Sequence, residues 1–401
     1  MTRTSGIVVL SRCIAIVIDP WDFPFNGTVV STRRFVKALE HQFNFKLLAT
    51  PDSAQPPDAR TVAFKRISVP GLNGLLKAMR VPLAMPDSGL IRKALQDVDL
   101  LHVQFPFFLG FAVISEARRQ GIPVVCSFHV QPENLLLNLG IRSRLLTKLI
   151  YKIFVAGFYN RANLVIAPSE FAAEALRANG LTTPVRVISN GVPEHFLNLQ
   201  RQPLCAGTEQ TAFTILSVGR LAREKQHRVL LEAIALSKYR NTIKLNIIGA
   251  GPLEKKLKNL VRQLQINVTI ESVSDDVLLD LYARADLFVH TGDIELEGMS
   301  VVEAMAAGNA VLVSDSADSA TGSLVSSKQA LFKHGDAKHL ASQIDFWLAS
   351  PEVRSLEGQA NRDWAAQRTH SLPVSQVASM YDEMAQPLLS ESFVPTGDRG
   401  Q

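Results

Sequence analysis

The stretch LFVHTGDIELEGMSVVEAMAAGNAVLVS, residues 287–314, contains two short apolar runs separated by a helical pattern. The runs at 287–290 and 310–314 are predicted to be buried strands, because they are short, continuous and apolar. The stretch between them, which ends at Gly308, is predicted to be a short helix. A strand, a helix and a second strand in this order form one unit of a parallel sheet. The segment therefore favours an α/β fold.

The same alternation of apolar runs and amphipathic patterns extends over most of the 401 residues. It predicts strands at residues 13–19, 46–49, 100–104, 124–129, 164–167 and 185–188, and then at 214–218, 244–248, 268–270, 287–290 and 310–314. One predicted helix covers residues 28–41, and another follows Ser169 as its cap and stops at Gly180. The pattern predicts doubly wound α/β domains.

Chain length and one polar segment indicate where the domains divide. A chain of 401 residues exceeds what one hydrophobic core usually organises. After the turn signal Asn190-Gly191, the residues that follow become polar and irregular. We expect a Rossmann-like domain over 1–197, a linker over 198–211, a second Rossmann-like domain over 212–374, a helix over 375–390 and a loose tail over 391–401. Ligands of such sheets bind at the carboxyl ends of the strands.

Composition narrows the class of protein. The net charge of +5 fits phosphorylated substrates, an anionic membrane or nucleic acid equally well. In the basic stretches 72–93 and 135–161, aromatic residues are not interleaved in the way that a base-stacking platform needs, which argues against nucleic acid. The three cysteines lie far apart, with no histidine spaced for zinc, which indicates a reducing compartment. With no apolar stretch of about 20 residues, we expect a cytoplasmic protein, or one bound to the inner face of the cell membrane.

A first cluster of candidate functional residues lies where the strand at 214–218 meets the next helix. Gly219, Arg220 and Lys225 occupy this turn. Free backbone N–H groups, the positive end of the helix dipole and two cations suit a diphosphate. A solvated charged loop is an equally good interpretation of this cluster taken alone.

A second cluster follows the strand at 287–290. Glu295 lies in the loop ahead of the short helix, and Ser300 and Glu303 have the spacing of a capping box. Glu303 could therefore serve only as a helix cap. However, two carboxylates and an exposed helix N-terminus converge on one edge of the sheet, where they can hold sugar hydroxyls and phosphate.

The spacing of Glu295, Gly298 and Glu303, with Gly219-Arg220 and Lys225 earlier, resembles the E-x7-E retaining glycosyltransferases of family 4, which have the GT-B fold. The resemblance covers nearly the whole chain and includes the segments at 167–169, 188–192, 248–253 and 282–289. It implies two Rossmann-like domains facing a central cleft, with the acceptor bound by the first domain and the nucleotide sugar by the second. It also implies that the helix at 375–390 crosses back to the first domain.

The resemblance also implies roles for the clustered residues. Arg220 and Lys225 would neutralise the departing diphosphate, Glu303 would bind the ribose, and Glu295 would lie by the transferred sugar. A nucleotide diphosphate sugar would be the co-substrate, with no metal and no other cofactor. The remaining donor-binding candidates are Asn26, Gly27, Gly219, Gly249, Gly298, Met299 and Ser300.

On the N-terminal side, His129 ends a predicted buried strand. A lone histidine at such a place is more often a satisfied core or loop residue. In the resembling enzymes a histidine at this strand end lies near the donor sugar and acceptor, so His129 is a catalytic candidate. His102, Phe105 and Gln131 are candidates for the acceptor side.

Residues 134–160 combine an apolar face with flanking cations. Such a helix can lie in the interface of an anionic membrane, and an ordinary domain helix with a basic edge is an equally good interpretation. The segments 128–134 and 316–321 are similar to a bacterial subgroup assigned to glycolipid or cell-envelope synthesis. The resemblance therefore implies transfer from a UDP-hexose to a lipid or lipid-linked saccharide, with retention of configuration.

Three alternatives accompany this hypothesis. A soluble acceptor would leave the chemistry unchanged, and an inactive GT-B subunit would bind a partner without binding a nucleotide. A nicotinamide-dependent dehydrogenase is suggested by Gly249-Ala250-Gly251, which follows a strand. The third glycine of that fingerprint is replaced by Glu254, which argues against the dehydrogenase.

Overall fold

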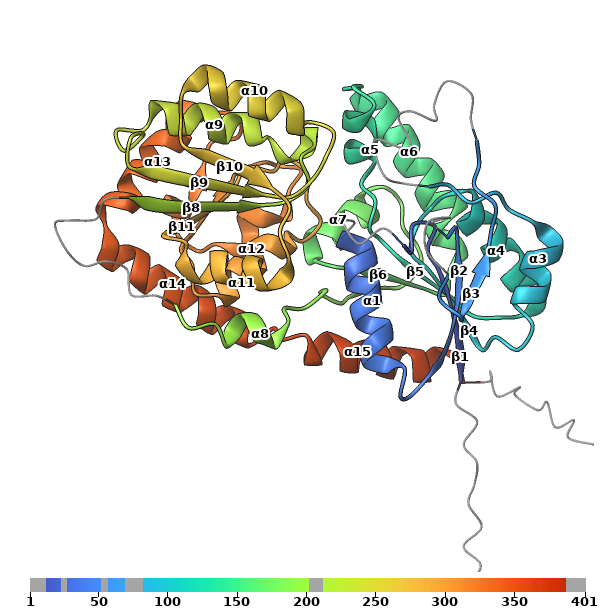
Figure 1. Ribbon diagram of the computed structural model, residues 1–401. Helices are drawn as coiled ribbons and strands as arrows, with labels where there is room; N and C mark the ends of the chain where they lie inside the picture. The colour runs from blue at the N-terminus through green and yellow to red at the C-terminus, as the bar shows by residue number, and fades with distance from the viewer. Residues whose placement is uncertain (1–11, 23–26, 52–56, 69–81, 202–211, 387–401) are drawn as a thin grey trace, which may run out of the picture.

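The computed structural model describes residues 12–22, 27–51, 57–68, 82–201 and 212–386. They form two α/β bodies side by side, each with a sheet between layers of helices (Figure 1). The fold predicted from the sequence, two doubly wound Rossmann-like domains, is confirmed. Among the described residues, no helix is long and apolar enough to cross a bilayer. Position 26, one of the predicted donor-binding residues, lies outside the described ranges.

The N-terminal sheet is parallel, with strand order β3-β2-β1-β4-β5-β6-β7. Its strands are β1 Cys13–Val17, β2 Asn44–Ala49, β3 Thr61–Ala63, β4 Leu100–Val103, β5 Val124–Ser127, β6 Leu164–Ala167 and β7 Val185–Val187. Its helices are α1 Gly27–Leu39, α3 Ser88–Ala94, α4 Phe108–Gln120, α5 Pro132–Asn138, α6 Arg144–Gly157 and α7 Glu170–Ala178. Side chains of β1 alternate between two cores: Ile14 and Ile16 face one, and Ala15 and Val17 face the other. Both faces are therefore covered, as a parallel sheet requires.

The C-terminal sheet has strand order β10-β9-β8-β11-β12-β13. Its strands are β8 Phe213–Val218, β9 Ile243–Ile248, β10 Val268–Glu271, β11 Leu287–His290, β12 Val311–Ser314 and β13 Leu331–Phe332. Its helices are α9 His227–Leu236, α10 Glu254–Leu264, α11 Asp275–Arg284, α12 Met299–Ala306, α13 Ala337–Ala349 and α14 Pro351–Ala366. Residues 287–314, the segment with which the sequence analysis began, form β11, α12 and β12, and β11 pairs with β12 in parallel.

The chain passes between the two bodies at two adjacent places. The first crossing leads into the short helix α8 (Glu194–Leu197), and the second leads into α15 (Ser371–Met384). The crossings pair where the backbone N of His370 donates to Val192 O at 2.8 Å. Val377, Met380 and Tyr381 of α15 then enter the N-terminal core. The last helix therefore begins in the C-terminal half of the chain and packs on the N-terminal sheet (Figure 1).

Candidate functional site

A cavity of about 1360 Å³ lies between the two bodies, and both contribute to its walls. Its C-terminal wall includes the loops after β8 and β11 and the start of α12. Its N-terminal wall includes the start of α1, the loop between β4 and α4, and parts of α5 and α6. The cavity is thus at the carboxyl ends of strands, where open α/β sheets bind ligands.

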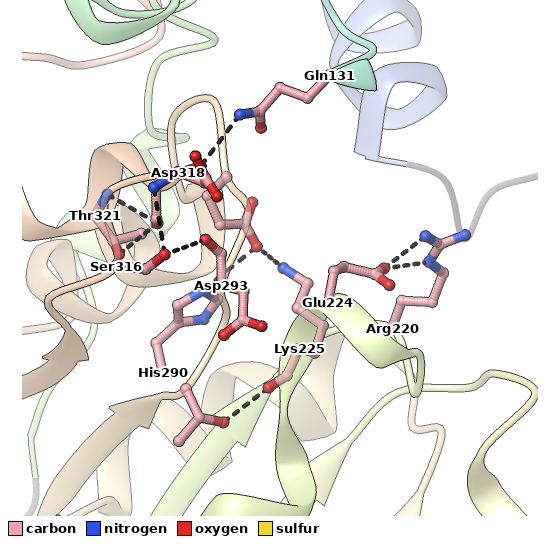
Figure 2. Close-up of polar contacts among 12 residues, drawn as sticks. Gln131, Arg220, Glu224, Lys225, His290, Asp293, Ser316, Asp318 and Thr321 are labelled. Atoms are coloured by element: carbon pink, nitrogen blue, oxygen red, sulfur yellow. Dashed lines mark hydrogen bonds and ion pairs between the residues drawn. The ribbon is translucent and has the colours of Figure 1, made fainter. Parts of the chain in front are cut away.

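The turn after β8 presents Arg220 and Lys225 to this cavity. Arg220 Nε donates to Glu224 Oε1 at 3.0 Å, and the two side chains point toward one another (Figure 2). The Glu224 residue is only 2% exposed, so its charge needs the guanidinium beside it. Glu224 was not predicted as a site residue, because in the sequence it is one more charge in a charged turn.

Lys225 and Glu295 form an ion pair across the end of the sheet. His290, the last residue of β11, places its Nε2 3.3 Å from Glu295 Oε1. Burial raises the pKa of Glu295, but the Lys225 ammonium and His290 outweigh burial and hold that pKa at about 2. Glu295 is therefore ionised, and Lys225 is oriented by a fixed anion. The contribution of His290 was not predicted from the sequence.

Glu303 does not cap α12, so the capping-box interpretation is wrong. The N-cap of α12 is Gly298, which has φ +86°, and no side chain caps the helix. Glu303 instead accepts from Tyr282 Oη at 3.2 Å, and Arg34 Nη2 of the N-terminal body lies 3.6 Å from Glu303 Oε1. Burial raises the pKa of Glu303, and Arg34 partly counters that rise.

Glu297, between the two predicted carboxylates, joins the two bodies. It accepts hydrogen bonds from the Ser189 hydroxyl, from the Asn190 side chain and from Asn190 N, the last at 3.0 Å. Nearby, Ser169 Oγ donates to Leu296 O. These N-terminal segments were predicted only as motifs of the resemblance, and their partners, more than 100 residues away, were not predicted.

Glycines allow the backbone to come close at the base of the site. Gly27, Gly219 and Gly298 line the cavity, together with Met299 and Ser300. A Cβ on Gly298 would lie 2.5 Å from Thr321 Cγ2. Gly249 is not among the lining residues: a Cβ there would lie 2.0 Å from Gly219 O, so Gly249 packs beneath the turn after β8. Gly251, not predicted, lines the cavity in its place.

The N-terminal wall contains three of the four predicted residues of that side. His129, Phe105 and Gln131 line the cavity. His129 Nε2 lies 3.0 Å from Gln104 Oε1, and burial lowers the pKa of His129 to about 4, so this imidazole is neutral near pH 7. Gln131 Nε2 donates to Asp318 O of the other body at 3.1 Å (Figure 2).

His102 lies elsewhere than predicted. It does not line the large cavity but reaches a cavity of about 40 Å³ beside it. Its two ring nitrogens lie 2.8 Å from Tyr381 Oη and 2.8 Å from Ser127 Oγ. His102 therefore anchors α15 to the N-terminal sheet. Among the described residues, no group of three or more His, Cys, Asp or Glu side chains could hold a metal ion.

Similar sequences cover both halves of the chain. The family model "Glycosyltransferase Family 4" matches residues 25–196, and the model "Glycosyl transferases group 1" matches residues 206–364. An alpha-monoglucosyldiacylglycerol synthase of Streptococcus pneumoniae is 28% identical over 54% of this chain, and the match spans about half (51%) of that relative. A GDP-mannose-dependent alpha-mannosyltransferase of Mycolicibacterium smegmatis is 29% identical over 75% of this chain and 79% of its own.

Solved structures share the two-body arrangement. Sucrose-phosphate synthase of Thermosynechococcus elongatus superposes with a TM-score of 0.73 at 17% identity, covering 93% of this chain and 99% of its own. HepE of Anabaena superposes with a TM-score of 0.70 at 19% identity, covering 93% and 100%. Their likeness concerns the fold alone, whereas the family models and the named relatives concern the sequence. The chain belongs to family 4 of the glycosyltransferases and is an enzyme of the GT-B fold.

Proposed function

We propose that the enzyme transfers a hexose from a UDP-hexose to a lipid or lipid-linked saccharide, with retention of configuration. The observation that carries this proposal is the contrast between the two walls of one cavity. Every acidic side chain among the lining residues belongs to the C-terminal wall, together with Arg220 and Lys225. The opposite wall is largely aromatic and aliphatic. A charged donor and an apolar acceptor therefore each have a matching wall.

On the donor side, breaking the bond between sugar and phosphate builds negative charge on the departing diphosphate. Cations that are already oriented stabilise that charge without reorganising. Lys225 is held by Glu295, and Arg220 is held by Glu224. In this proposal both cations turn free N–H groups to the diphosphate, and no metal or other cofactor takes part.

Two acids of the C-terminal wall, Glu303 and Glu295, have separate tasks toward the donor in the proposal. Glu303 accepts hydrogen bonds from the ribose hydroxyls, which is the chemistry of an ionised carboxylate. Glu295, between Lys225 and His290, lies by the transferred sugar. Gly27, Gly219 and Gly298, with Met299 and Ser300, bring backbone close to the donor.

Retention fits the distribution of acids around the cavity. No aspartate or glutamate occurs among the described N-terminal lining residues, so that wall offers no carboxylate nucleophile or base. In the proposal, the acceptor oxygen attacks from the side on which the diphosphate leaves, and that diphosphate takes the acceptor proton. His129, neutral and bonded to Gln104, orients hydroxyls beside the reacting carbon.

An apolar acceptor is favoured over a soluble one by the N-terminal wall. Phe105 and Phe107 stack with ring centroids 5.4 Å apart, and Phe111 and Leu135 extend the same wall. One relative is named alpha-monoglucosyldiacylglycerol synthase. We accordingly place the enzyme in envelope glycoconjugate synthesis, at the cytoplasmic face of the membrane.

A donor screen tests the proposal. UDP-, GDP- and ADP-hexoses are each added to the full chain, and the melting temperature is measured, since a ligand of the folded state raises it. We expect stabilisation by a UDP-hexose. With that donor, whose sugar is α-linked, we expect transfer to a lipid acceptor, and NMR of the product should show an α-linkage. Stabilisation by GDP-mannose alone would replace the proposed donor. A folded protein that no nucleotide sugar stabilises would refute the enzymatic proposal.

A further inference from the structure

The outer side of α6 carries two parallel rows of side chains. Leu145, Leu149 and Ile153 form an apolar row at i, i+4 and i+8, and they are 83%, 52% and 51% exposed. Arg144, Lys148 and Lys152 form an exposed basic row with the same spacing. Residues four apart lie on one side of a helix, so the rows run next to each other along it. We call these six residues the α6 face.

The rest of α6 accounts for its attachment to the protein but leaves the α6 face uncovered. Tyr151, Phe154 and Val155, on the inner side, are buried in the N-terminal core. A Leu that is 83% exposed contributes nothing to that core and costs solubility. Covering the outer apolar row therefore requires a partner outside the described part of the chain.

The charge of this region indicates which partner fits. No aspartate or glutamate occurs between Asn134 and Asn160, whereas arginine and lysine occur repeatedly. A lipid surface that is apolar below and anionic at its headgroups matches adjacent apolar and basic rows. A second copy of the chain would bring like charges together. Nucleic acid would leave the apolar row in water.

The α6 face is continuous with the margin of the cavity. Leu139 follows α5 and Phe108 begins α4; both line the cavity, and they are 43% and 59% exposed. Ile141, 40% exposed, lies in the chain between Leu139 and α6. Figure 1 shows α5 and α6 side by side at the end of the N-terminal body, with α5 nearer the C-terminal body. Exposed apolar side chains thus lead from α6 to the cavity.

We propose that the α6 face docks on an anionic bilayer and sets the cavity margin at Leu139 and Phe108 against its acyl region. Resting on the proposed function, this arrangement lets the acceptor keep its apolar tail in lipid while its hydroxyl reaches the donor. The acceptor then enters from the membrane plane and not from bulk water. The α6 face and the donor site are separate surfaces, so they can be tested separately.

Vesicle flotation of the full chain tests the docking surface. Vesicles of phosphatidylcholine, alone or with about one-third phosphatidylglycerol, are compared, because basic residues near a surface respond to anionic lipid. We expect binding only to the anionic vesicles. Leu145→Gln/Leu149→Gln and Lys148→Glu/Lys152→Glu should each weaken it by at least about tenfold. Leu356→Gln is the matched control, since Leu356 of α14 is 73% exposed on the other body.

A spectroscopic variant tests the orientation. Leu139→Trp places an indole at the cavity margin, and anionic vesicles with brominated acyl chains should quench its fluorescence; in Leu356→Trp they should not. Unchanged flotation of both α6 double variants, or equal quenching at the two positions, would overturn the proposal. Stabilisation by a UDP-hexose is measured in every variant. Loss of this stabilisation with flotation intact would count against the proposed function. Loss of flotation with the stabilisation intact would not.

Discussion

The two walls of the cavity differ in the chemistry of their side chains. On the C-terminal wall the site residues are charged and paired: Arg220 with Glu224, and Lys225 with Glu295. On the N-terminal wall, Phe105 and Phe107 stack on each other and no acid occurs among the described lining residues. Charges that must be oriented need fixed partners, whereas an apolar surface needs only area and shape. Substitutions on the two walls should therefore impair different properties of the enzyme.

The loop and helix start at residues 295–303 join the walls. Glu297 accepts from Ser189 and Asn190, and Ser169 donates to Leu296 O. Arg34 approaches Glu303, which lies in the same segment. The segment that carries the predicted donor carboxylates thus also carries contacts between the bodies. Four predictions distinguish the loss of a donor contact from the loss of a contact between the bodies.

The largest effect is expected from Lys225→Ala. It removes the cation nearest Glu295 and leaves the departing diphosphate without that stabilisation. We expect kcat/KM to fall by roughly 10²–10³-fold, the usual cost of losing a preorganised charge-stabilising group. Steady-state transfer rates measure it. Arg284→Ala is the control, because Arg284 pairs with Asp280 on the exposed side of α11 and neither residue lines the cavity; rates equal to that control would remove Lys225 from the mechanism.

The same substitution should change stability in a pH-dependent way. The pKa of Glu295 is held at about 2, below the ordinary 4.5, so its ionised form stabilises the fold above about pH 4.5 and this contribution is lost as the pH falls towards 2. Without Lys225, burial dominates and the pKa of Glu295 rises. We expect Lys225→Ala to lower the free energy of unfolding by roughly 3 kcal/mol near neutral pH, with the difference vanishing in acid. Urea denaturation across pH measures this, and a difference that is constant with pH would contradict it.

The sequence predicted the sheets well because short apolar runs between helical patterns are a local signal. The strands β6 and β11 have the bounds expected for them. The edge strands β3 and β13 were not predicted, since Thr61–Ala63 and Leu331–Phe332 are too short to show a pattern. Ser169 was correctly predicted as a cap, and its Oγ accepts from Ala172 N at 3.1 Å.

The candidate site was harder to predict wherever geometry depends on distant segments. The spacing of Ser300 and Glu303 suggested a capping box, but the φ of +86° at Gly298 sets the helix start elsewhere. The partner of Glu303, Arg34, lies on the other body and nothing in α1 marks it. His102 looked like His129, yet Tyr381, far along the chain, holds it away from the large cavity. The spacing of residues along the sequence cannot predict such contacts.

An intermediate effect is expected from Arg34→Ala. Burial raises the pKa of Glu303 and Arg34 opposes that rise, so the variant should protonate Glu303 at a higher pH. Since a protonated carboxyl accepts ribose hydroxyls less well, donor affinity should fall by about tenfold and fall further as the pH decreases. Calorimetric titration with UDP-glucose between about pH 5 and 8 measures this.

Arg33→Ala is the matched control for that prediction. Arg33 is the neighbouring cation of α1, but its guanidinium lies over the Trp21 ring at 5.0 Å and near Asp22, away from Glu303. The pH dependence of its donor affinity should match the wild type. If both variants bind donor equally well at every pH, the Arg34–Glu303 contact has no part in donor binding.

The smallest effect, from Gln131→Ala, separates the two tasks of the N-terminal wall. Gln131 was predicted to face the acceptor, yet its amide donates to Asp318 O across the cavity at 3.1 Å. If that bond helps to hold the bodies together, its loss should weaken donor affinity by about fivefold, as for one net hydrogen bond, and should increase the radius of gyration in X-ray scattering. If Gln131 serves the acceptor instead, only the KM for acceptor should rise.

Asn138→Ala is the control for this prediction, because Asn138 also lines the cavity but its side chain bonds within α5, to Asn134. A change confined to the acceptor KM would assign Gln131 to the apolar wall, and a change in donor affinity would assign it to the contacts that join that wall to the charged one.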